Sequence, residues 1–135
     1  MRTNINRIAL AMFALCICLS VPLPAFSIRT DDMLKGSDMM VKGADMMMTK
    51  DLQMMLDGHA MLLDGYAMVK SSGMMEKDAG MLLKGCALMM DGGALMMKHD
   101  EQSMNNGVKL LRDGKAKVLD GQKVMLLDSQ KMLKQ

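Results

Sequence analysis

Large apolar residues and small residues recur in a heptad pattern that runs without insertion or deletion from Met33 to the C-terminus. One heptad column is apolar at twelve of fifteen positions, and the next is apolar at fourteen of fifteen, with Glu76 as its one exception. The column three residues further on is Gly, Ala, Ser or Cys at eleven of fifteen positions. This spacing is typical of helices that pack closely against other helices. The pattern therefore predicts an all-α fold of long heptad-repeat helices.

The glycines of the repeat predict small holes with apolar rims on the helix surface. Residues three and four apart are neighbours on a helix, so Gly65 is framed by Met61, Leu62, Met68 and Val69. Each glycine costs an isolated helix about 1 kcal/mol relative to alanine, so close packing must offset that cost. We predict a packed seam of large Met/Leu and small Gly/Ala residues. The glycines expected to pack against a neighbouring helix are Gly58, Gly65, Gly85, Gly92, Gly114 and Gly121.

Two polar interruptions divide the repeat. They lie at Lys70-Ser71-Ser72-Gly73 and between His99 and Gly107, and they predict helices over 31–70, 74–98 and 107–134. A helical hairpin or a three-helix coiled-coil-like arrangement follows from these breaks. One continuous helix is the main alternative, because the heptad register survives both interruptions. A β-rich solenoid with turns at each Asp-Gly is a weaker alternative, since Met, Leu and Ala dominate between the glycines.

The N-terminus has the organisation of a secretory signal peptide over residues 1–27. A short basic start precedes an apolar run from Ile8 to Leu19, and Ala25 and Ser27 occupy the small-residue positions of a cleavage site. We expect an exported protein, periplasmic or extracellular, whose mature chain is the helical repeat region 28–135. An uncleaved N-terminal anchor is the alternative.

The composition of region 28–135 argues against several functions. Removing Arg2 and Arg7 from the 17 basic residues leaves 15, which balance the 15 acidic ones, and Tyr66 is the single remaining aromatic residue. Such a chain has neither a basic patch nor a stacking platform for nucleic acid. Cys86 is the one cysteine of the region, so no disulfide within the chain is expected. No nucleophile with a base and an orienting group stands apart from the repeat, so no enzymatic activity is predicted.

A second apolar face predicts a partner. Between residues 53 and 97 the side opposite the glycines is also apolar, and an isolated short chain can hardly cover two faces of helices this long. We expect a homo-oligomer or association with another helical protein, with contact to a membrane surface as an open alternative. The segment from Ala79 to Met97 carries Lys84 and Asp91 and makes a poor transmembrane helix. The residues of the second face are Leu56, Ala60, Leu63, Ala67, Leu83, Ala87, Met90, Ala94 and Met97.

The methionine content raises the question of soft-metal binding. Twenty methionines lie in region 28–135, and thioethers select Cu(I) or Ag(I). No two of these methionines are three or four residues apart, the intervals at which one helix brings two ligands together. Some pairs of a methionine with a histidine or cysteine do have helical spacing. Sites built from two helices do not depend on spacing along one helix. The candidate metal ligands are Met55 with His59, Cys86 with Met89 or Met90, and Met96 with His99.

The sequence thus predicts a non-enzymatic exported helical repeat protein that acts by close helix-helix association with itself or with a partner. The alternative is a periplasmic or extracellular protein that binds or buffers Cu(I) or Ag(I) through methionine thioethers. No cofactor other than such an ion is expected.

Overall fold

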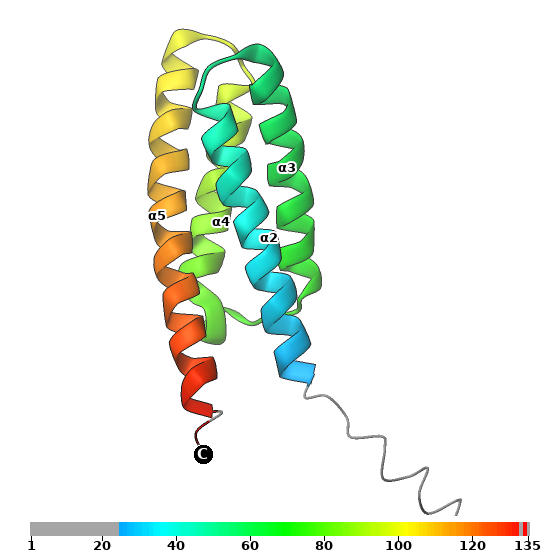
Figure 1. Cartoon of the computed structure of the whole chain (residues 1–135). Helices are drawn as coiled ribbons and strands as arrows, with labels where there is room; N and C mark the ends of the chain where they lie inside the picture. Colours follow the sequence, from blue (N-terminus) through cyan, green and yellow to red (C-terminus); the bar gives the residue numbers. More distant parts are fainter. Residues whose placement is uncertain (1–24, 133, 135) are drawn as a thin grey trace, which may run out of the picture.

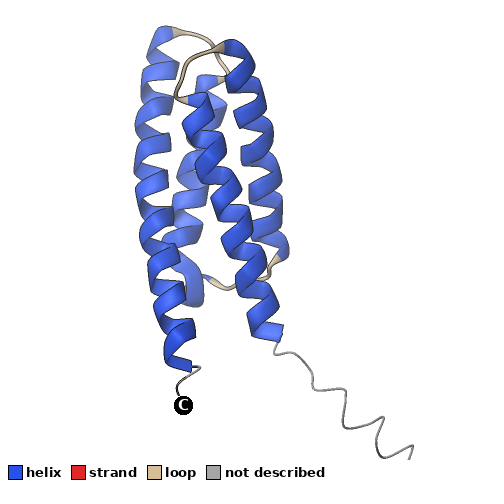
Figure 2. Cartoon of the chain, viewed as in Figure 1, coloured by secondary structure: helices blue, strands red, loops and turns tan. Residues whose placement is uncertain are grey.

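The computed structural model describes residues 25–132 and Lys134, and in this part of the chain all regular structure is helical (Figures 1 and 2). Most of the predicted signal peptide, residues 1–27, therefore lies outside the described residues. The four helices lie side by side, and the prediction of an all-α fold is confirmed. In chain order they are α2 (Ala25–Met47), α3 (Leu52–Ser71), α4 (Glu76–Met96) and α5 (Glu101–Met132).

The predicted helix boundaries are wrong at two places. The expected helix 31–70 is divided by a turn at Met48–Asp51 into α2 and α3, so the described chain is neither one continuous helix nor three. The second break was placed too late, because α5 begins at Glu101 and contains Asn105, Asn106 and Gly107. The interruption near Lys70–Gly73 does lie at a turn, where Gly73 has a positive φ of 65°.

Two turns reverse the chain at the same end of the molecule (Figure 1), and they are built alike. Lys50 and His99 each adopt a left-handed backbone conformation, with φ of 62° and 59°. An aspartate follows each of them and caps the next helix. Asp51 Oδ1 accepts a hydrogen bond from Met54 N at 3.0 Å, and Asp100 Oδ1 accepts one from Ser103 N at 2.8 Å.

The likeness of the two turns reflects an internal repeat of 49 residues. Residues 33–72 align without gaps to residues 82–121, and 16 of these 40 positions are identical. The first copy contains α2 and α3, and the second contains α4 and α5. Each position in one helix pair therefore has a counterpart in the other pair, which allows direct comparison of their surfaces.

Close contacts between helices are concentrated within the two antiparallel pairs, α2 with α3 and α4 with α5, and are few between the pairs. In the described residues α3 and α5 make no close backbone contact with each other. Polar groups join α2 to α5: Lys115 Nζ lies 2.6 Å from Asp45 Oδ1, and the Gln122 side chain donates to Ser37 Oγ at 2.8 Å. The shared core consists mainly of Met, Leu and Val side chains.

Candidate functional site

Glycines bring the two backbones of each helix pair into contact. A Cβ atom built on Gly65 would lie 2.5 Å from the carbonyl oxygen of Gly36, and one on Gly58 would lie 2.5 Å from that of Gly43. The second pair repeats this arrangement at 2.7 to 2.8 Å, with Gly85 facing Gly114 and Gly92 facing Gly107. Any side chain larger than hydrogen would force these backbones apart.

Large side chains lie directly on the same glycines. The Cγ atoms of Met47 and Met40 lie 2.9 Å and 2.8 Å from the Cβ positions of Gly58 and Gly65. In the second pair, Met89 lies in the same way on Gly114, and Leu82 packs on Gly121. The structure thus places all six of the glycines singled out by the sequence in contacts within the chain. The glycine surfaces are covered in the monomer, and they are not free to receive a partner.

The candidate metal ligands occupy different environments. Met55, Cys86, Met89 and Met96 are buried, His59 and Met90 are half-buried, and His99 is exposed in the second turn. Met96 is thus buried while His99, its predicted partner, is exposed to solvent. Within the described residues, no three His, Cys, Asp or Glu side chains come together as a metal-binding group.

One contact that spacing along the chain did not predict brings a thioether and an imidazole together. A Cβ atom on Gly93 of α4 would lie 2.8 Å from Leu62 Cδ1, 3.5 Å from Met47 Sδ and 3.6 Å from His59 Cδ2. Met47 comes from α2 and His59 from α3, so this is a contact among three helices. Because the residues come from three helices, no interval along a single helix predicts this contact.

Cys86 is a buried thiol in α4, at the position where the first repeat copy has Ser37. Desolvation raises the pKa of this thiol from 9.0 to about 12. Since the thiolate is the nucleophile and the metal-binding form, burial makes Cys86 chemically inert at neutral pH. This argues against Cys86 as a ligand for a metal ion that reaches it from solvent.

We expect Cys86 to react with a thiol-specific dye at pH 8 on the order of a thousandfold more slowly in the folded protein than in urea.

Between about pH 9 and pH 12 the thiol of unfolded Cys86 has lost its proton, while the thiol of folded Cys86 keeps it. The unfolded state then binds fewer protons, so stability should fall as pH rises through this window. Urea unfolding of the wild type and of Cys86→Ser at pH 8 and pH 10 checks this. An equal pH dependence in both proteins would contradict it.

The outward side of α3 carries an apolar stripe, which we call the α3 stripe. Leu52, Leu56 and Leu63 are 60%, 44% and 46% exposed, and Ala60 and Ala67 are exposed between them. At 100° per residue these five positions fall within about 80° of the helix circumference. Four of them, Leu56, Ala60, Leu63 and Ala67, belong to the second apolar face predicted from the heptad pattern. On α4 that face is partly covered, because Leu83, Met90 and Met97 pack against the core.

The internal repeat supplies a comparison for the α3 stripe. The counterparts on α5 are Glu101, Asn105, Lys109, Arg112 and Ala116, and all five are exposed. The same structural positions are therefore apolar in one copy and mostly polar or charged in the other. Packing within a helix pair does not require apolar residues here, so the α3 stripe needs a separate explanation.

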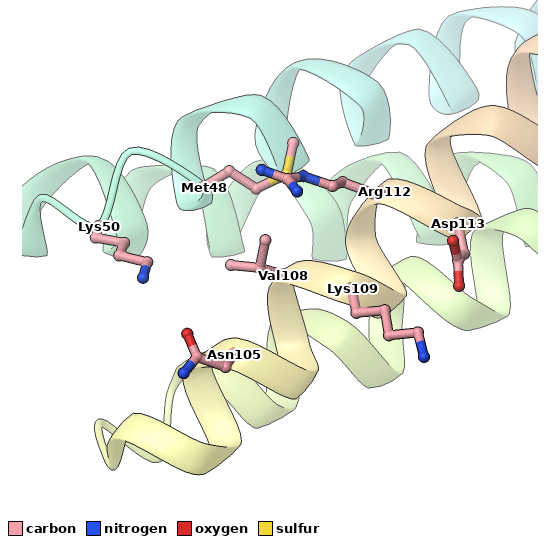
Figure 3. A pocket seen from close by; sticks show the side chains of 7 residues that line it. All are labelled: Met48, Lys50, Asn105, Val108, Lys109, Arg112 and Asp113. Carbon is pink, nitrogen blue, oxygen red and sulfur yellow. The ribbon is translucent and has the colours of Figure 1, made fainter.

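Three of the α5 counterparts line a shallow pocket beside the first turn (Figure 3). Lys50, Lys109 and Arg112 supply positive charge there, and Asp113 lies at its edge. In Figure 3 the three cationic groups point in different directions. The pocket thus has no convergent set of donors for an anion.

One segment of the described chain, Ala79–Met96, is long and apolar enough to cross a membrane by length and composition alone. Its mean hydropathy is 1.2, and 44% of it is buried inside the protein.

Comparison of the chain with protein-family models, with curated proteins and with solved structures finds no match.

Proposed function

We propose that the protein is an exported, non-enzymatic helical module that works by helix-helix association, and that its association surface is the α3 stripe. The observation that supports this proposal is the difference between the two repeat copies, in which exposed Leu56 and Leu63 of α3 replace Asn105 and Arg112 of α5. Exposed leucines that recur along one helix face are typical of a surface that is covered in an assembly. The glycine contacts of each helix pair serve as close-packed, coiled-coil-like seams that hold this surface rigid.

A second copy of the chain is the partner that the α3 stripe fits best. From Leu56 to Ala67 large and small residues alternate along it, as they do where Met40 and Met47 lie on glycines inside the first helix pair. In an antiparallel pair of α3 helices centred between Met61 and Leu62, Leu56 faces Ala67 of the second copy and Leu63 faces Ala60. Every leucine of this central stretch then meets an alanine, so the two backbones can approach closely.

Sedimentation velocity of the purified exported protein over a range of concentrations tests this proposal. The expected result is a reversible monomer-dimer equilibrium. A protein that stays monomeric at every concentration would overturn self-association.

The orientation of the two copies has a further testable consequence. Asp57 and Asp64 are exposed along one edge of the α3 stripe, and a two-fold antiparallel pair brings this edge of one copy against the same edge of the other. Removing both charges by Asp57→Asn with Asp64→Asn should therefore tighten the dimer about threefold to tenfold, as expected for relief of two exposed like-charge contacts. In a parallel pair Asp64 would instead meet His59 of the second copy, and the same variant would weaken the dimer.

Soft-metal binding is the second candidate function. It is supported by the packing at Gly93, where a buried thioether and a half-buried imidazole lie next to the same glycine, beside Leu62. Thioether and imidazole are ligands that Cu(I) accepts, and soft sulfur ligands favour it over harder cations. We propose this function alongside association, because the two use different surfaces of the molecule.

A further inference from the structure

The Met47 and His59 side chains come from different helices and reach the same point. The two distances at Gly93, 3.5 Å to Met47 Sδ and 3.6 Å to His59 Cδ2, limit the separation of these two atoms to about 7 Å. In the imidazole ring Nε2 is bonded directly to Cδ2, so Nε2 is the ring nitrogen that would serve as the ligand. Leu62 Cδ1 lies closest to this point, 2.8 Å from the Cβ position of Gly93, so an ion bound between the two groups would need rotation of the Leu62 side chain as well as of Met47 and His59.

The chemistry of both groups suits a soft monovalent ion. Met47 is fully buried, and its sulfur is therefore surrounded by apolar atoms rather than by water. His59 is half-buried and accessible to solvent, and its ring makes no hydrogen bond to the described residues. A neutral imidazole nitrogen with a free lone pair is a good ligand for copper. Met55, one helical turn before His59 on α3, is buried and lies on the side of the helix where it can supply a second thioether.

The internal repeat predicts that this site exists once per chain. The counterparts of Met47, His59 and Gly93 are Met96, Val108 and Ala44. The thioether of Met47 is thus retained at Met96, but a valine replaces the imidazole and an alanine replaces the glycine on which Leu62, Met47 and His59 lie. Met96 packs on Gly107 just as Met47 packs on Gly58, which makes it a matched control for Met47.

We propose that Met47 and His59, with Met55 as the third ligand, bind a single Cu(I) or Ag(I) ion beside Gly93. This inference rests on the second proposed function, and it names the site and its stoichiometry. The site is open to solvent on the side of His59, and this half-buried side chain provides the entry path for the ion.

The first experiment uses Ag(I) as the probe and the two histidine rings as reporters. The chain has only His59 and His99, so a spectrum of the imidazole groups contains two sets of signals. One equivalent of Ag(I) should shift the signals of His59 and leave those of exposed His99 unchanged. If His99 responds instead, or if neither ring responds, the proposed site is wrong.

The second experiment measures affinity by competition with a colorimetric Cu(I) chelator. Met47→Leu and His59→Leu should each lower the affinity of the one tight site at least tenfold, while Met96→Leu should leave it unchanged. Thermal melts of all three variants without metal show whether any loss comes from unfolding. If Cu(I) binds tightly but equally to every variant, soft-metal binding survives and this site is overturned. If the wild type does not compete with the chelator at all, the second proposed function fails together with the site.

Discussion

Replacing Gly65 by alanine is expected to destabilise the folded protein by about 2 kcal/mol. A Cβ atom at Gly65 would lie 2.5 Å from the carbonyl oxygen of Gly36 and 3.0 Å from the amide nitrogen of Met40. Both are backbone atoms, so rotation of a side chain cannot relieve the clash and α2 must move away from α3. Overpacking of this kind costs about 1 to 3 kcal/mol or more, and the better helix propensity of alanine returns about 1 kcal/mol.

Gly80→Ala is the matched control, because Gly80 is also a helical glycine. Its nearest neighbour would be Glu76 Cγ at 3.4 Å, the middle of a flexible side chain, so we expect an increase in stability of up to about 1 kcal/mol. Urea unfolding followed by circular dichroism measures both variants. Equal stability of Gly65→Ala and the wild type would show that the backbones of α2 and α3 do not need this close approach.

The helical character of the chain was predictable because it depends on local features that the sequence displays. Both prolines, Pro22 and Pro24, precede the heptads, and Met, Leu and Ala recur with helical spacing. The turn at Met48–Asp51 was not predictable in the same way. Lys50 adopts φ of 62° without being glycine, and Met47 and Met48 continue the apolar pattern up to the turn. Only tertiary packing reveals that the chain reverses there.

The contact partners of the glycines could not be predicted, for a physical reason. A hole with an apolar rim accepts a knob equally well from the same chain or from another one. In the structure Met40 and Met47 fill the holes at Gly65 and Gly58 from the preceding helix, because the missed turn brings α2 back along α3. The glycines are therefore covered within the chain, and the surface we expect to contact a partner is the outward side of α3.

The internal repeat was hidden by the heptad pattern itself. A spacing of 49 residues is seven heptads, so every column keeps its character whether or not the two halves are compared. The signal lies in paired details such as Asp51 with Asp100 and Gln53 with Gln102. The same comparison along the outward faces of α3 and α5 shows which residue types the fold itself requires. The exposed leucines of α3 are not among them, so they require a different explanation.

Glutamate at both central leucines of the α3 stripe, Leu56→Glu with Leu63→Glu, is expected to abolish dimer formation. Burying a leucine side chain stabilises an association by about 1.5 to 3 kcal/mol, and a two-fold dimer loses each contact twice. Even partial burial of these side chains makes the loss at least about 3 kcal/mol, which weakens the dimer more than a hundredfold. Because Leu56 and Leu63 are already 44% and 46% exposed in the single chain, the variant should still fold.

The control for this variant uses the second repeat copy. Asn105→Glu with Ala116→Glu adds the same two negative charges at the counterparts of Leu56 and Ala67, on a helix whose exposed large apolar residues begin only at Leu119. Sedimentation should show a monomer for the α3 variant and an unchanged monomer-dimer equilibrium for the α5 variant, while circular dichroism shows equal helicity in both. If both variants dissociate, net charge rather than the α3 stripe governs assembly. If neither does, the copies associate through a different surface, and the outward leucines of α3 have no role in self-association.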